Sequence, residues 1–131
     1  MKKGEVAYCP RYQFANGTVS DKLLINLNNP LDQDPYLVLL TTSKQKFRKN
    51  NPGCHSAQGY YLISKDVDFF NEDTWVLFHT LREFTLKDEL KESWSNNLKI
   101  MQPLKDTTLR AIINCLKQSN YITKYQMLLL K

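Results

Sequence analysis

The central strand of the fold is predicted by one stretch of the sequence, Tyr36-Leu37-Val38-Leu39-Leu40-Thr41-Thr42-Ser43. Its first five residues are apolar without a break. A strand with one solvated face would alternate, so the run indicates a strand buried on both faces. Three hydroxyl side chains end the stretch, and the basic residues Lys44, Lys46, Arg48 and Lys49 follow it. Small donors beside cations suit a bound phosphate; the alternative is a core strand that enters a solvated loop.

The length and composition predict a single domain, residues 1–131, with a hydrophobic core. Hydrophobic residues make up 42% of the chain, which excludes an intrinsically disordered class. No apolar run approaches the ~20 residues that cross a bilayer, and no apolar segment follows the two N-terminal lysines. We therefore expect a cytoplasmic protein without a membrane partner. The net charge of +5 is compatible with a polyanionic partner.

The three cysteines, Cys9, Cys54 and Cys115, are odd in number and far apart, and no CxxC pair occurs. This pattern disfavours a disulfide framework and a zinc cluster, so we expect buried or inert thiols and no metal site. Cys54 stands beside His55 in a loop rich in Gly, Asn and Ser. A hydrolase that uses this pair is therefore kept as a third functional hypothesis.

Further strands are predicted where apolar and β-branched residues are bounded by turn residues, at 4–9, 22–27, 60–64, 74–81 and 98–102. We expect Pro10 to end the first of them and Asn16-Gly17 to form a turn within a loop at 11–20. Residues 44–58 show no hydrophobic period, which predicts a long surface loop.

Two helices are predicted in the C-terminal third of the chain. Thr85 begins a short capped helix, and another starts near Asp106, where Leu109, Ile112, Ile113 and Leu116 recur at helical spacing. The apolar tail, residues 121–130, is consistent with an edge strand, a helix or an interface. Because most strands follow one another without a helix between them, we predict an α+β fold with a small, largely antiparallel sheet or barrel.

The order of these elements resembles the MazF/PemK-like toxins of bacterial toxin-antitoxin systems. The resemblance covers roughly residues 3–118 and rests on Gly4-Glu5-Val6, on the cation-led strand 22–27 and on the strand that ends in Thr41-Thr42-Ser43. It implies an SH3-like small antiparallel β-barrel with a C-terminal helix packed on it, and a homodimer. It also implies metal-independent, sequence-selective cleavage of single-stranded RNA without a cofactor. Residues 121–131 form an extension beyond it.

Site positions carry over from the family residue by residue. Thr41 matches the threonine that ends the family's strand, and Thr42 and Ser43 fill the adjoining Thr/Ser positions. The family's second strand begins with Arg-Pro, whereas Lys22-Leu23 stands in that place here, which is the largest departure. Lys22 supplies a positive charge but lacks the planar fork of arginine. Arg11, in the preceding loop, is the candidate to replace the guanidinium.

Cleavage of this kind uses the 2′-hydroxyl of the RNA as nucleophile and leaves a 2′,3′-cyclic phosphate. The resemblance implies a catalytic set of Lys22, Thr41, Thr42 and His79. His79 suits an acid or base role because its unperturbed pKa is about 6.5, and its alternative role is a packed residue in an aromatic strand. The expected RNA-binding residues are Arg11, Ser43, Lys44, Lys46, Arg48 and Arg82, with Tyr12 or Phe14 stacking on bases.

Two functional hypotheses come before the Cys54–His55 hydrolase. The first is an endoribonuclease toxin that an antitoxin protein neutralises by covering the RNA groove. The second is a catalytically inactive, nucleic-acid- or protein-binding SH3-like barrel, and its main support is the missing Arg-Pro.

Overall fold

The apolar run at residues 36–40 forms the central strand β3 (Tyr36–Thr42), as predicted. All five interior residues of β3 are buried, because the strand has neighbours on both sides and an apolar cluster on each face. Leu37 and Leu39 belong to the larger cluster, whereas Val38 and Leu40 belong to a second one on the opposite face. The alternation of β-strand side chains thus divides one apolar run between two cores.

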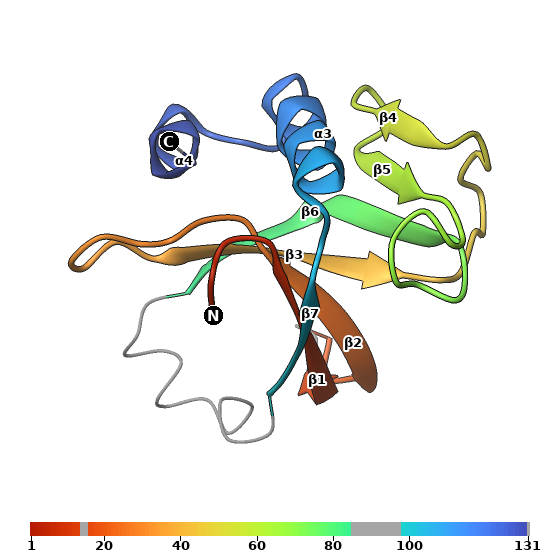
Figure 1. Cartoon of the computed structure of the whole chain (residues 1–131), viewed down its shortest axis with the longest axis horizontal. Helices are drawn as coiled ribbons and strands as arrows, with labels where there is room; N and C mark the ends of the chain where they lie inside the picture. Colours follow the sequence, from red (N-terminus) through yellow and green to blue (C-terminus); the bar gives the residue numbers. More distant parts are fainter. Residues whose placement is uncertain (14–15, 85–97, 131) are drawn as a thin grey trace.

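A computed structural model describes residues 1–13, 16–84 and 98–130, without the side chains of residues 11–13. In these ranges the other strands are β1 (Glu5–Gln13), β2 (Val19–Asn26), β4 (Gly53–His55), β5 (Tyr60–Ile63), β6 (Thr74–Phe84) and β7 (Lys99–Pro103). The pairing is antiparallel throughout, in the order β4-β5-β6-β3-β2-β1-β7. Figure 1 shows β1, β2 and β7 running steeply across the direction of β3 and β6. The α+β prediction is confirmed.

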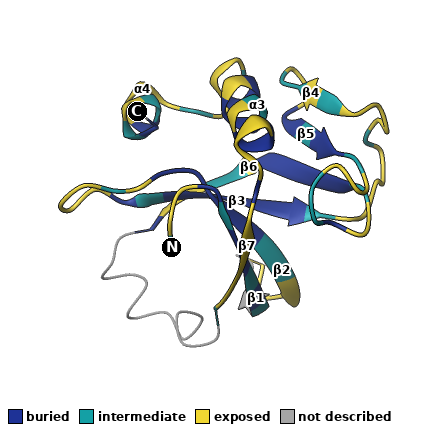
Figure 2. Cartoon of the chain, in the orientation of Figure 1, coloured by how far each residue is buried: buried dark blue, intermediate teal, exposed yellow. Residues whose placement is uncertain are grey.

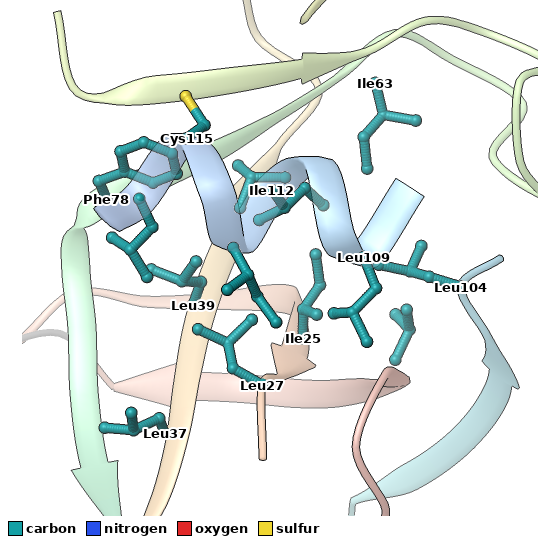
Figure 3. Packing of buried hydrophobic residues seen from close by; sticks show 14 of the residues in the cluster. Ile25, Leu27, Leu37, Leu39, Ile63, Phe78, Leu104, Leu109, Ile112 and Cys115 are labelled. Atoms are coloured by element: carbon teal, nitrogen blue, oxygen red, sulfur yellow. The ribbon is translucent and has the colours of Figure 1, made fainter. Parts of the chain in front are cut away.

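Helix α3 (Asp106–Lys117) covers the face of the sheet that carries the larger core. The four residues predicted to share one stripe, Leu109, Ile112, Ile113 and Leu116, are all buried. Figure 3 shows Leu109 and Ile112 pointing from α3 toward Ile25, Leu27 and Leu39. The opposite face of the helix is exposed (Figure 2), so α3 is amphipathic in the way its spacing predicts.

Two predicted boundaries near the N-terminus are wrong. Pro10 does not end the first strand, since β1 continues to Gln13, and the expected loop at 11–20 is mostly the β1–β2 hairpin. The register of this hairpin shifts between Cys9 and Tyr12. An irregularity of this kind accommodates a proline, which has no N–H for the ladder.

The predicted loop at 44–58 is also too long. Its second half contains the short strand β4, which pairs with β5 through Cys54 and Tyr61. The strands predicted at 60–64, 74–81 and 98–102 are confirmed as β5, β6 and β7, although β6 extends three residues further, to Phe84. The short helix predicted from Thr85 lies outside the described residues.

The C-terminal tail forms helix α4 (Lys124–Leu129), so the helix is confirmed and the edge strand is wrong, while an interface role stays a prediction. A capping box begins this helix: Gln126 N donates to Thr123 Oγ1, and Thr123 N donates to Gln126 Oε1. Gln126 Nε2 also donates to Glu83 Oε2 on β6 over 3.0 Å. The tail is therefore packed against the domain. In the described part of the chain, no helix is long and apolar enough to span a membrane.

The prediction of inert thiols is wrong for two of the three cysteines, because Cys54 and Cys115 form a disulfide. The β4–β5 hairpin brings Cys54 to α3, and the two Cα atoms are 5.5 Å apart despite a separation of 61 residues. Figure 3 shows Cys115 at the end of α3. Cys9 is a buried thiol, as expected. Since Cys54 carries no thiol in this structure, the Cys54–His55 hydrolase hypothesis loses its nucleophile.

Candidate functional site

A pocket of ≈ 550 Å³ opens where β2 and β3 lie side by side near the turn that precedes β6. Five residues predicted for the site line it together: Lys22, Thr41, Thr42, Ser43 and Lys44. Lys22 is close to the others because β2 and β3 pair antiparallel, with Leu24 opposite Leu40. Lys22, at the start of the aliphatic stretch of β2, therefore lines the same pocket as Thr41, Thr42 and Ser43 at the end of β3.

The two adjacent threonines of this pocket have different hydrogen bonds. Thr41 is buried, and its hydroxyl donates to the carbonyl oxygen of Leu23 over 3.0 Å. A hydroxyl has a single proton, so Thr41 uses its donor inside the protein. Thr42 is half-buried, and its Oγ1 accepts from the backbone N–H of Lys44. That bond leaves the proton of the Thr42 hydroxyl to donate, and Ser43 beside it is exposed.

Lys22 stands in a positive environment. Burial lowers the pKa of its ammonium group first, and the charges of Lys44, Lys46 and Arg48 lower the same pKa further. Repulsion of this kind requires that Lys44, Lys46 and Arg48 each lie within electrostatic range of Lys22. An anion bound in the pocket would reduce the repulsion and replace part of the water that Lys22 loses on burial.

Two carboxylates, Asp21 and Glu72, also line the pocket, and the sequence reasoning missed both. Asp21 Oδ2 accepts a hydrogen bond of 2.8 Å from the hydroxyl of Tyr8, which raises the pKa of that tyrosine. The sequence offers only a weak indication of their role in the pocket. Asp21 directly precedes Lys22, and Glu72 lies in a turn. A carboxylate beside cations can accept a proton, so this mixed lining offers a base as well as anion-binding groups.

His79 is exposed on β6, outside the residues that line the pocket. Partial burial lowers the pKa of its imidazole first, and the positive charge of Arg48 lowers the same pKa second. Arg48 therefore interacts with both Lys22 and His79, and this connects His79 electrostatically to the pocket. At neutral pH a histidine with a lowered pKa is uncharged and can act as a base.

The basic segment after β3 is held in place by hydrogen bonds although it has no regular structure. Arg48 Nη1 donates to the carbonyl of Lys44, and Gln45 Nε2 donates to the carbonyl of Arg48. The backbone of Lys49 is bound at both ends: its N–H donates to Tyr60 Oη over 2.8 Å, and its carbonyl accepts from Trp75 Nε1 over 3.1 Å. We call residues 44–49 the basic loop.

Two other predicted RNA-binding residues, Arg82 and Arg11, do not line the pocket in the described structure. Arg82 is exposed, and its guanidinium lies 4.3 Å from the centre of the Phe84 ring. Arg82 pairs with Val38, four residues before Thr42 on β3, which is about 13 Å along a strand. Arg11 belongs to β1, but its side chain, like those of the expected stacking residues Tyr12 and Phe14, lies outside what the structure describes.

A second pocket, of ≈ 510 Å³, runs along α3 and carries Lys3, Arg110 and Lys117. The exposed ring of Phe47, by contrast, belongs to the basic loop beside the first pocket. Within residues 1–13, 16–84 and 98–130, no group of three His, Cys, Asp or Glu side chains could hold a metal ion. The first pocket thus concentrates the hydroxyl donors and cations that the sequence singled out.

Compared with protein-family models, with curated proteins and with solved structures, the chain matches none of them. The resemblance to MazF/PemK-like toxins therefore rests on the residues quoted for it alone. The features of this chain that bear on its function are the first pocket, the basic loop and His79.

Proposed function

We propose that this chain is a MazF/PemK-like toxin with an SH3-like barrel, which binds single-stranded RNA at the first pocket and cleaves it without a metal. The observation that carries the proposal is the convergence of Lys22, Thr42, Ser43 and Lys44 on one pocket, with Arg48 in electrostatic range. Hydroxyl donors beside several cations are suited to a phosphodiester.

In the proposed reaction the 2′-oxygen of the RNA attacks the adjacent phosphorus and the bond to the 5′-oxygen breaks. The products are a 2′,3′-cyclic phosphate and a 5′-hydroxyl. Thr42 and Ser43 donate to the phosphate oxygens, where negative charge accumulates in the transition state. Thr41 positions them, because its hydrogen bond to Leu23 holds the end of β3 against β2.

Two groups with lowered pKa values fit the proton transfers. His79 in its neutral form accepts the proton of the 2′-hydroxyl, since its pKa is lowered by burial and by Arg48. Lys22 donates a proton to the leaving 5′-oxygen. Its pKa is also lowered, which makes it a stronger acid than an ordinary lysine. Asp21 is a second candidate base within the pocket.

A second candidate function is RNA binding without cleavage. Lys22 favours this alternative, because a point charge replaces the bidentate guanidinium that the family uses at this position. The internal hydrogen bond of Thr41 favours it too, since that hydroxyl donates to Leu23. The two functions share the pocket and differ only in whether the bound strand is cut.

The partners proposed with this function are a second copy of the chain and an antitoxin protein, and the proposed compartment is the cytoplasm. The Cys54–Cys115 disulfide speaks against that compartment, because cytosolic proteins rarely keep structural disulfides. Trapping the thiols with a maleimide in intact cells, before lysis, tests this point. A protected Cys54 after expression in a reducing cytoplasm would show that the bond persists there.

The decisive experiment incubates the purified full chain with a mixed RNA pool in EDTA and analyses the ends of the products. We expect 2′,3′-cyclic phosphate ends, lost in Lys22→Ala and in Thr42→Val. Lys117→Ala is the matched control, because it removes an exposed cation from the second pocket. Binding of intact RNA without cleavage would establish the second function instead. Absence of both binding and cleavage would overturn the proposal.

A further inference from the structure

Phe47 has the most exposed side chain among the large hydrophobic residues of the described chain, with 86% of its surface open to solvent. Burying a phenylalanine side chain stabilises a fold, and Phe47 does not contribute in this way. It stands between Lys46 and Arg48 on the basic loop, and Lys44 of the same loop lines the first pocket. An aromatic ring is thus presented to solvent on a loop that carries four cationic residues, Lys44, Lys46, Arg48 and Lys49.

The loop presents this ring on a fixed backbone. Arg48 N donates to the carbonyl of Gln45, and the backbone of Lys49 is bound by Tyr60 and Trp75. Lys46 has a φ of 50°, a left-handed conformation that turns the chain directly before Phe47. A ring on a loop that is already ordered loses little conformational entropy when a ligand stacks on it.

Arg48 connects the ring to the pocket. Its guanidinium carbon lies 5.0 Å from the centre of the Phe47 ring, within the range of a cation–π contact. The same guanidinium lowers the pKa of Lys22 and that of His79. Arg48 Nη1 also donates over 3.1 Å to the carbonyl oxygen of Lys44, a residue that lines the pocket, so Arg48 and the ring beside it adjoin the pocket wall.

We infer that Phe47, with Arg48 beside its ring, forms a stacking site for an unpaired nucleobase of the strand whose phosphate occupies the first pocket. This inference rests on the proposed function, which already takes a single strand, and adds that at least one base of that strand is splayed onto Phe47. Every base has a π face, so stacking of this kind tolerates different sequences. Bases of a duplex are already stacked on one another and do not reach the ring.

The test measures the affinity of the full chain, at one salt concentration, for a short single-stranded RNA, for its duplex and for the same strand with abasic positions. We expect Phe47→Ala to weaken binding of the single strand by about 5- to 150-fold, since a stacked base contributes about 1–3 kcal/mol. The same variant should bind the abasic strand as the wild type does. Phe47→Trp should retain the affinity, whereas Phe47→Leu, apolar but without a π face, should lose it.

Each of the following results would overturn the stacking site. Phe47→Ala could bind the single strand as tightly as the wild type while Lys22→Ala binds weakly; the proposed function would then stand without this site. Equal losses on the natural and abasic strands would show that Phe47 acts through the loop conformation. If RNA affinity is unchanged and self-association is lost, the ring serves a protein contact. If the wild type binds no RNA, the proposed function and the stacking site are both overturned.

Discussion

Thr41 donates its hydroxyl hydrogen bond to the carbonyl oxygen of Leu23, 3.0 Å away, and so joins β3 to β2 at the edge of the first pocket. The backbone pairing of these strands reaches Leu24 and Leu40. The Thr41 side chain extends the connection by one more residue. Thr42, next in the chain, has a hydroxyl that accepts from Lys44 N and can still donate. Thr41 thus supports the wall of the pocket, whereas Thr42 keeps a hydroxyl proton that it can donate.

Replacing each threonine by valine should separate these roles. Thr41→Val leaves the partly buried Leu23 carbonyl without its donor, so we expect a loss of about 0.5–1.5 kcal/mol in the free energy of unfolding. Thr42→Val should unfold like the wild type but bind RNA more weakly. Urea denaturation and filter binding measure the two effects. A Thr41→Val protein as stable as the wild type would contradict the structural role of this hydrogen bond.

Lys22 should contribute one phosphate contact to RNA binding. Removing a contact to a single strand reduces the slope of log K against log salt by about 0.7, so Lys22→Met should show a correspondingly flatter salt dependence. Lys22→Arg should keep the slope and cleave faster, because the guanidinium grips phosphate with two donors. Lys117→Met, on α3, should leave the slope unchanged; a flattening there would place the RNA at the second pocket instead.

The lowered pKa of His79 predicts how stability and activity depend on pH. The folded state binds the imidazole proton less tightly than the unfolded state does, so the free energy of unfolding should fall as pH drops below about 6.5. The acid limb of any His79-dependent cleavage should likewise lie below that pH. Titration followed by NMR, with His79→Gln to assign the signal, measures the pKa directly.

Arg48→Gln tests the second cause of this shift. Losing the guanidinium should move the pKa of His79 upward, toward its ordinary value, while the contribution of burial remains. If the titration of His79 is the same in Arg48→Gln and in the wild type, Arg48 does not connect this histidine to the pocket.

The disulfide should be visible in thiol counts and in stability. Unfolded without reductant, the chain should expose one reactive thiol, that of Cys9, and three after reduction. Because the bridge joins residues 61 positions apart, reduction should lower the free energy of unfolding by about 2–4 kcal/mol. Cys54→Ser should show the lower stability with or without reductant, and a wild type insensitive to reductant would contradict the bond.

Much of the fold could be predicted because local patterns of apolar residues determine the central strand and the helix. Five apolar residues in a row identified β3, and the spacing of Leu109, Ile112 and Leu116 identified α3, since each pattern reflects burial that tertiary packing then confirms. Boundaries were less predictable. Pro10 is a usual strand terminator, yet a register shift between β1 and β2 accommodates it, and such a shift depends on the partner strand.

Only part of the first pocket could be predicted from the sequence, because strand pairing brings its other residues together. Thr42 and Lys44 are close in the sequence, so their proximity was evident, whereas Lys22 joins them only through the antiparallel register of β2 with β3. Glu72 enters the pocket from a turn that is distant in the sequence. The exposure of Phe47 has no sequence signal, because an aromatic residue in a loop usually packs against the rest of the domain. The solvent exposure of a side chain such as Phe47 depends on every segment that packs around it, so it is known only from the tertiary structure.

The sequence by itself determined the central buried strand, the helix that lies on the sheet, and the succession of hydroxyls and cations after residue 40. These features follow from the chemistry of residues that are neighbours in the sequence, so they can be predicted without knowing which segments pair in the fold. Tertiary structure alone decided that Lys22 and Thr42 line the same pocket, that Thr41 donates to Leu23, and that Cys54 reaches Cys115. Such contacts depend on strand register and helix placement, which minimise the free energy of the whole chain.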